Sequence, residues 1–156
     1  RLWQACALLG TIYDKQKLHP SAIESYRKAV AINPQVASLY VDLGASLYLT
    51  GQYRESAEAL LKAISLDDSN SKAYNSLGLA LFKMGMFSEA HEAFEKGSDE
   101  ASAYNHMGVL YLKEKNYEKA AQSFEKAIDL KPTYYTSAHM GLERAKAGLK
   151  AQGQSR

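Results

Sequence analysis

Apolar residues recur along this chain at steps of three and four, in stretches that short polar segments interrupt. Tyr40, Leu43 and Leu47 show the pattern, and Gly44 directly follows the first leucine. Steps of three and four residues place side chains on one face of a helix. Each such stretch therefore predicts an amphipathic helix with a glycine on its apolar face.

A polar break and a second periodic run follow each of these stretches. After Thr50, Gly51 and Gln52, for example, Leu60 and Ala63 continue the steps of three and four. Two amphipathic helices joined by a short turn make a helical hairpin. We therefore expect the chain to consist of helical hairpins.

The same glycine returns at nearly fixed intervals along the chain. The intervals between Gly10, Gly44, Gly78 and Gly108 are 34, 34 and 30 residues. Self-similarity at this period is the signature of a repeat array. Glycine lets the helices of a pair approach, while a large residue of the second helix fills the space between units. The predicted units are residues 3–36, 37–70, 71–100 and 101–134, and their large residues are Tyr26, Leu60, Phe94 and Phe124.

The third unit is shorter than the others, because residues 97–100 lead directly into Ala101 and about one turn of its second helix is missing. A tolerated deletion is the favoured interpretation. The alternative is a bend in the array of hairpins, which would reshape the binding surface or free a surface for a partner.

Residues 135–150 predict one further helix, with its basic residues away from its apolar stripe. We expect this helix to cap the fourth unit, which makes residues 1–150 a single domain and residues 151–156 a flexible tail. The apolar stripe consists of Ala138, Leu142, Ala145 and Leu149.

The fourth unit carries the most complete pattern, with Tyr104, Met107, Gly108, Tyr111, Tyr117, Ala120, Phe124, Ala127 and Pro132. This pattern resembles the tetratricopeptide repeat (TPR), and the resemblance extends over nearly the whole chain. It implies an all-α fold, a right-handed superhelix of four helix-turn-helix repeats plus a C-terminal capping helix. It also implies a concave groove, lined by the first helices, that binds a peptide segment of a partner.

Asn75 and Asn105 are the leading candidates for peptide contacts in that groove, since they occupy equivalent places in adjacent units. An amide side chain can both donate to and accept from an extended peptide backbone. The alternative is that both are solvated residues or hold local helix contacts. The further candidates in the groove are Lys72, Leu79, Phe82, His106, Val109, Tyr48 and Val41.

Family members that dock the acidic C-termini of heat-shock chaperones carry lysine, asparagine and arginine in the groove. The set could begin at the first or at the second unit of this chain, and in neither case are those residues present, so we expect no carboxylate clamp. A mixed lining favours an extended or helical segment held by apolar anchors. The clamp positions would fall at Ala7, Thr11 and Asp42 in one register, and at Val41, Ala45, Ser76 and His106 in the other.

The formal net charge is only +2 and the basic residues are interspersed with acidic ones, so we expect no nucleic-acid partner. No apolar run approaches the roughly 20 residues of a membrane-spanning helix, and we expect a soluble chain, in the cytoplasm or the periplasm. Cys6 is the single cysteine and fits a small core residue. The opening Arg1 predicts an excised piece or a processed product.

Motifs for catalysis and for cofactors are missing from the sequence: there is no phosphate-binding glycine loop, no His-Glu-x-x-His and no Gly-x-Ser-x-Gly. His106 and His139 face the same groove in the repeat pattern, but two histidines fall short of a zinc ligand set. We therefore expect no enzyme activity, no cofactor and no metal.

The leading hypothesis is a non-catalytic scaffold or adaptor that holds a partner's peptide segment in its groove. The second hypothesis is a structural assembly module of a bacterial secretion or pilus apparatus, acting by self-association or through convex-face contacts. The short third unit and residues 132–135 resemble bacterial TPR proteins of pilus assembly, the tight-adherence D group.

Restoring four residues after Gly97 distinguishes the two interpretations of the short third unit. If the deletion is merely tolerated, partner affinity and thermal stability stay unchanged in a binding assay and a melting experiment. A change in affinity without a loss of helical content would favour the bend that shapes a binding surface.

Overall fold

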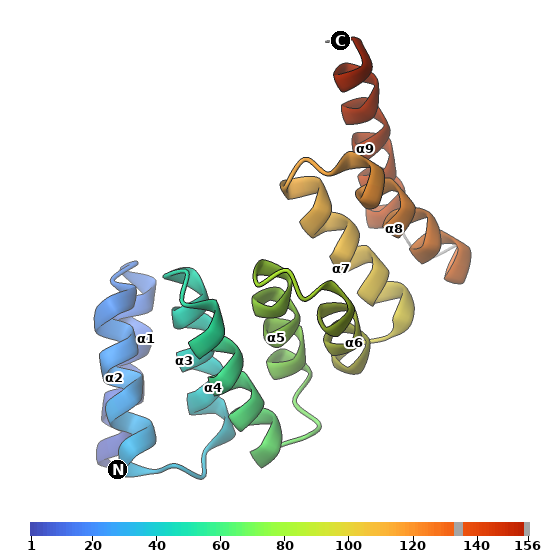
Figure 1. The fold of residues 1–156 in the computed structure, drawn as a ribbon. Helices are drawn as coiled ribbons and strands as arrows, with labels where there is room; N and C mark the ends of the chain where they lie inside the picture. The colour runs from blue at the N-terminus through green and yellow to red at the C-terminus, as the bar shows by residue number, and fades with distance from the viewer. Residues whose placement is uncertain (133–135, 155–156) are drawn as a thin grey trace. The chain divides into compact units, whose positions relative to one another are not determined.

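A computed structural model describes residues 1–132 and 136–154 of the chain, and the regular structure of these residues is helical throughout (Figure 1). Residues 133–135, which carry part of the likeness to pilus-assembly proteins and the first residue of the predicted capping helix, lie outside the described residues. The helices are α1 (Leu2–Lys15), α2 (His19–Ile32), α3 (Ala37–Leu49), α4 (Tyr53–Leu66), α5 (Ser71–Lys83), α6 (Phe87–Gly97), α7 (Glu100–Lys113), α8 (Tyr117–Leu130) and α9 (Thr136–Gln154).

These helices form the helix-turn-helix repeats that the sequence predicts. Contacts group the chain into two compact units, Arg1–Ala93 and Phe94–Arg156, and the division falls within α6. Each unit is described by itself, and the single domain expected over residues 1–150 stays a prediction.

The turns inside the repeats share one backbone conformation. Lys17, Gly51, Gly85 and Lys115 have φ angles of 60°, 79°, 78° and 58°, which lie in the left-handed region. This region reverses the chain after a helix, and glycine adopts it without the steric cost that a side chain adds. The two glycines therefore suit the tight turn of their repeats.

In unit 1, the first helices α1, α3 and α5 follow one another along the unit, and the second helices α2 and α4 pack against them (Figure 1). The regularly spaced glycines let the two helices of each pair approach closely, because glycine has no side chain. A Cβ atom at Gly44 would lie 2.7 Å from Cγ of Leu60, and one at Gly10 would lie 2.7 Å from Cε1 of Tyr26. Small residues of the first helix thus receive large residues of the second, as the sequence predicts.

Ser56 occupies a position that is alanine in the three other repeats, and it is fully buried on α4. Its hydroxyl donates to the backbone carbonyl of Gly44 at 2.7 Å. A buried hydroxyl costs free energy unless it is hydrogen-bonded, and this bond offsets that cost while tying α4 to α3.

In unit 2, the ring of Phe124 is enclosed between α7 and α9. A Cβ atom at Gly108 would lie 2.7 Å from Cε1 of this ring, and a Cβ atom at Gly141 would also collide with it. Phe124 is fully buried, so the two glycines leave room for one aromatic ring between three helices.

The capping helix predicted over residues 135–150 corresponds to α9, which continues to Gln154. Ala138, Leu142 and Ala145 are buried against α8, as the stripe predicts, whereas Leu149 is exposed. The second half of the helix also packs on α8, because a Cβ atom at Gly148 would collide with the ring of Tyr117, and the helix extends four residues into the expected flexible tail.

The shortened third repeat is visible as a short second helix. α6 has 11 residues, whereas α2, α4 and α8 have 14 each. Asp99 then begins α7, because its Oδ1 accepts a hydrogen bond from the backbone N–H of Ser102 at 2.9 Å. Its Oδ2 accepts a charged hydrogen bond from Nζ of Lys131 at 2.8 Å, which ties the start of α7 to the end of α8.

Replacing Gly108 by alanine tests the packing around Phe124. We expect the free energy of unfolding to fall by about 1 to 3 kcal/mol, because the new methyl group forces the aromatic ring to move within a filled core. Gly153→Ala is the matched control, since nothing lies within 4 Å of a Cβ atom there. Urea titration followed by circular dichroism measures both, and equal stability of the two variants would contradict the tight fit.

Asp99 gives unit 2 a specific acid sensitivity. The hydrogen bonds from Lys131 and Ser102 lower the pKa of Asp99 to about 2. The contribution of this carboxylate to stability is therefore present above the unfolded-state pKa of about 4 and is lost as the pH falls towards about 2. In Asp99→Asn, which keeps an acceptor oxygen but no charge, we expect this part of the pH dependence to vanish.

The difference in unfolding free energy between the unmodified chain and Asp99→Asn, measured from pH 7 downwards, isolates this group from the other carboxylates. Asp99→Ala also removes the helix cap and should cost about 1 kcal/mol at neutral pH. Glu125→Gln, an exposed change on α8, is the control. If the difference in unfolding free energy between the unmodified chain and Asp99→Asn stayed constant across the acid range, the ion pair between Asp99 and Lys131 would contribute nothing to stability.

Candidate functional site

The candidate site consists of the first-helix faces, meaning the exposed sides of α1, α3 and α5 in unit 1 and of α7 and α9 in unit 2. The residues predicted to bind a peptide divide between the two units. Val41, Tyr48, Lys72, Asn75, Leu79 and Phe82 belong to unit 1, and Asn105, His106 and Val109 belong to unit 2.

Two of the predicted contact residues lie in the interior. Val41 and Phe82 are each 2% exposed. Val41 packs among the buried residues of α4 and α5, and the ring of Phe82 meets that of Phe87 edge-on at 5.1 Å. Their side chains hold the helices together and offer no surface to a peptide, so they are not part of the proposed contacts below.

Lys72 and Asp42 form an ion pair on the first-helix face of unit 1, with 3.5 Å between Nζ and Oδ1. Burial raises the pKa of Asp42, an effect that Lys72 opposes and Asp14 reinforces. The lysine is exposed and already engaged with a carboxylate. This pairing makes Lys72 a poor receptor for a second carboxylate, in agreement with the missing clamp.

Asn75 is the unusual side chain of this face. Its Oδ1 is buried and lacks a hydrogen-bond partner. An unpaired buried acceptor is costly, and its presence is a reason to look for a donor from outside the chain. Leu79 and Tyr48 are partly exposed on the same set of helices, and the ring of Tyr48 packs on Tyr53 at 5.4 Å.

Asn105 in unit 2 differs from Asn75, although the two occupy equivalent places in their repeats. Its Oδ1 accepts a hydrogen bond from the hydroxyl of Ser137 at 3.2 Å. This bond joins α7 to α9, which is the local helix contact that the sequence left open as an alternative. The Nδ2 group of Asn105 is the part of the amide that a ligand would use.

His106 is a half-buried imidazole whose ring packs on Phe94 at 4.9 Å. Burial lowers its pKa, so the ring is neutral at neutral pH. Its Nδ1 is buried without a hydrogen-bond partner. Val109, one turn further along α7, packs partly against the core of unit 2.

Sequence reasoning missed a polar network at the start of unit 1. The carboxylate of Asp14 accepts from Ser46 at 2.6 Å through Oδ2 and contacts Nδ1 of His19 at 2.9 Å through Oδ1. Nearby, the hydroxyl groups of Thr11 and Tyr26 lie 3.3 Å apart, and burial raises the pKa of Tyr26 to about 12. A signal existed, because Ser46 is the polar exception at a buried position that holds alanine and leucine in later repeats.

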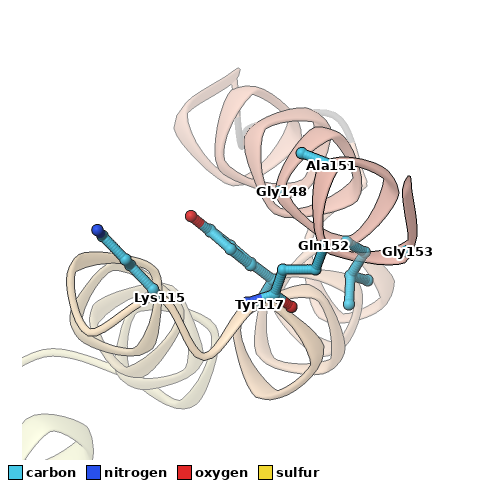
Figure 2. Close-up of a pocket in the computed structure, with 7 residues that line it drawn as sticks. Lys115, Tyr117, Gly148, Ala151, Gln152 and Gly153 are labelled. Atoms are coloured by element: carbon cyan, nitrogen blue, oxygen red, sulfur yellow. The ribbon is translucent and has the colours of Figure 1, made fainter. Parts of the chain in front are cut away.

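A cavity lies between the start of α8 and the end of α9 (Figure 2). Its volume is about 720 Å³, and Figure 2 shows the ring of Tyr117 between Lys115 and the helix that carries Gly148. The lining consists of Lys115, Tyr117, Gly148, Leu149, Ala151, Gln152 and Gly153. No pair of acid and base side chains converges there.

Among residues 1–132 and 136–154, no group of three or more histidine, cysteine, aspartate or glutamate side chains is placed to hold a metal ion. The same described helices include none with the length and apolar character that a membrane crossing requires.

Solved structures with this fold are similar to both units of the chain. The crystal structure of MamA matches at 24% identity with a TM-score of 0.67, covering 96% of this chain and 87% of that one. YrrB, described as a TPR protein with an unusual peptide-binding site, matches at 27% with a TM-score of 0.64, covering 84% and 70%. The second TPR of Spaghetti (RPAP3), bound to the HSP90 peptide SRMEEVD, matches at 27% with a TM-score of 0.61, covering 62% and 90%.

Comparison with curated proteins gives no match. Models of the repeat family match three stretches of the chain: the tetratricopeptide repeat over residues 4–36, the TPR repeat over residues 44–85 and the tetratricopeptide repeat over residues 101–134. These stretches contain the glycine and large-residue pairs that hold the hairpins together. The chain therefore belongs to the tetratricopeptide repeat family, whose domains act in protein interactions.

Proposed function

We propose that this protein is a non-catalytic scaffold that binds an extended peptide segment of a partner on its first-helix faces. The observation that carries the proposal is the buried, unpartnered Oδ1 of Asn75 on α5. Two similar structures support the general mode, since YrrB is described as having a peptide-binding site and the Spaghetti domain holds a peptide.

The contact at Asn75 follows from hydrogen-bond accounting. Leaving an acceptor desolvated costs about 1 to 3 kcal/mol, and a backbone N–H of a bound segment would offset that cost once the partly exposed side chain of Asn75 turns towards the segment. An extended segment presents such N–H groups along its length. Unit 2 offers a separate candidate contact, because the Nδ2 group of Asn105 would donate to a peptide carbonyl while its Oδ1 stays with Ser137.

The chemistry of the face favours a segment with apolar side chains over an acidic tail. Leu8 on α1, Leu49 on α3 and Met140 on α9 are exposed large apolar residues of the helices that carry the first-helix faces. Lys72 is paired with Asp42, and His106 is neutral at neutral pH. Apolar anchors therefore supply most of the affinity and the amides fix the direction of the backbone.

The assembly hypothesis and the likeness to pilus-assembly proteins stay predictions.

Alanine at both Asn75 and Asn105 tests the peptide site. A segment selected from a displayed peptide library serves as ligand, and calorimetry measures its affinity. We expect the double variant to bind about 1 to 3 kcal/mol more weakly, because each amide loses its bond to the peptide backbone. Asn75→Asp keeps an acceptor oxygen at this position and should retain more affinity than Asn75→Ala.

Gln122→Ala is the matched control, because it removes an exposed amide from α8, a second helix. Circular dichroism establishes that each variant keeps its helices. Full affinity of the folded double variant would place the peptide site elsewhere and end the case for these two amides.

A further inference from the structure

Asn105 and His106 are consecutive residues on the first-helix face of unit 2, and both are partly exposed. The ring of His106 packs on the buried ring of Phe94, with 4.9 Å between the centroids. Burial lowers the pKa of this imidazole, so the ring is uncharged at neutral pH. A neutral imidazole keeps one nitrogen as a hydrogen-bond acceptor, but no group of the described residues donates to the buried Nδ1.

Asn105 supplies the complementary donor. Its Oδ1 accepts a hydrogen bond from the hydroxyl of Ser137 at 3.2 Å, so the amide is oriented and its Nδ2 group is the end that a ligand can use. A residue in an extended chain presents its N–H and its C=O on the same side. One donor and one acceptor at consecutive positions of α7 therefore match the backbone groups of one extended residue.

The histidine is individual to this repeat. The equivalent positions of the other repeats hold Leu8, Asp42, Ser76 and Met140. Leucine, serine and methionine carry no charge that changes with pH, and aspartate ordinarily titrates well below neutral pH. His106 is thus the one side chain at this position whose ordinary pKa lies close to neutral pH.

We propose that Asn105 and His106 together bind the backbone of one residue of the partner segment, and that acidification releases this contact. Nδ2 of Asn105 donates to the carbonyl of that residue, and the neutral imidazole of His106 accepts from its N–H. The inference rests on the peptide-binding function proposed above and adds the regulation of that binding by pH.

The acceptor reaches the segment by a rotation of the imidazole alone. A half-turn about the Cβ–Cγ bond exchanges Nδ1 with Cδ2 and keeps the ring on Phe94, and this torsion is broad and roughly two-fold. The ring is half-buried, so turning it moves Nδ1 away from the covered edge. The N–H of a bound segment then satisfies a nitrogen that the free chain leaves unpaired.

Protonation of the ring removes the acceptor. An imidazolium has two donors and no acceptor, so it would oppose the N–H of the segment with another N–H. The bound state therefore excludes a proton that the free protein can take up. By linkage, the affinity falls by about tenfold for each pH unit once the pH lies well below the pKa of the free imidazole. Because burial holds this pKa below its ordinary value of 6.5, binding is constant at neutral pH and weakens only in acid.

The charged groups around His106 do not account for its lowered pKa, which has burial as its cause. On α8, Lys119 and Lys126 lie over the rings of Tyr111 and Tyr104. The titration of His106 is therefore set by the cover over the ring, which a bound segment would extend. Exposed titratable side chains on the other helices of unit 2 include Glu95 and Lys96 on α6, Lys113 on α7, and His139 and Glu143 on α9.

Calorimetry from about pH 8 to about pH 5 tests the contact, since this range spans the titration of histidine. The ligand is a library-selected segment without histidine, aspartate or glutamate and with blocked termini, so that its own charge stays constant. For the unmodified chain we expect constant affinity near neutral pH and, at the acid end, a fall that approaches about tenfold per pH unit.

His106→Gln should remove this fall, because an amide oxygen accepts the same bond at every pH. Any slope that remains in this variant belongs to other groups, such as Asp42, whose pKa is raised by burial. His139→Gln is the matched control, since it removes an exposed histidine from α9 of the same unit and should keep the fall. Circular dichroism at each pH establishes that the variants keep their helices.

Equal pH profiles for the unmodified chain and His106→Gln, or tighter binding in acid, would overturn the proposal. Proton NMR of the imidazole adds a direct measurement, because the titration midpoint of His106 should move to lower pH when the segment is bound. An unchanged midpoint would place the segment away from the ring. A segment that depends on Asn75 but not on His106 overturns this inference alone, whereas failure of the library to give any segment overturns the peptide-binding proposal as well.

Discussion

The close contact between a glycine on the first helix of a repeat and a large side chain on its second helix is the constraint on which this structure depends. Gly10 meets Tyr26, Gly44 meets Leu60 and Gly108 meets Phe124, each at a distance that leaves no room for a Cβ atom. Because the large side chain also reaches the next helix of the array, one contact fixes both the hairpin and its stacking. In unit 2, α9 supplies a second glycine, Gly141, against the same ring of Phe124.

This constraint is local and periodic, and for that reason the sequence predicts it well. Helix positions, the turn between the helices, the short third repeat and the helix after the fourth repeat all follow from the spacing of small and large residues. The end of α9 was harder to predict, since residues after 150 are small or polar and carry no apolar stripe. The sequence also could not predict which individual groove residues are exposed to solvent. Val41 and Phe82 share helices with exposed residues, but both side chains are buried.

The candidate site depends on interactions that no repeat pattern encodes. Asn75 and Asn105 are equivalent by position, yet one acceptor oxygen is unpartnered and the other is bonded to Ser137. The difference arises from Ser137, a residue of α9 that is 32 positions away in sequence. Asp14, Ser46 and His19 likewise meet only after three helices have packed. In the sequence, only Ser46 pointed to this network, because it is a serine at a stacking position and a buried hydroxyl requires a hydrogen-bond partner.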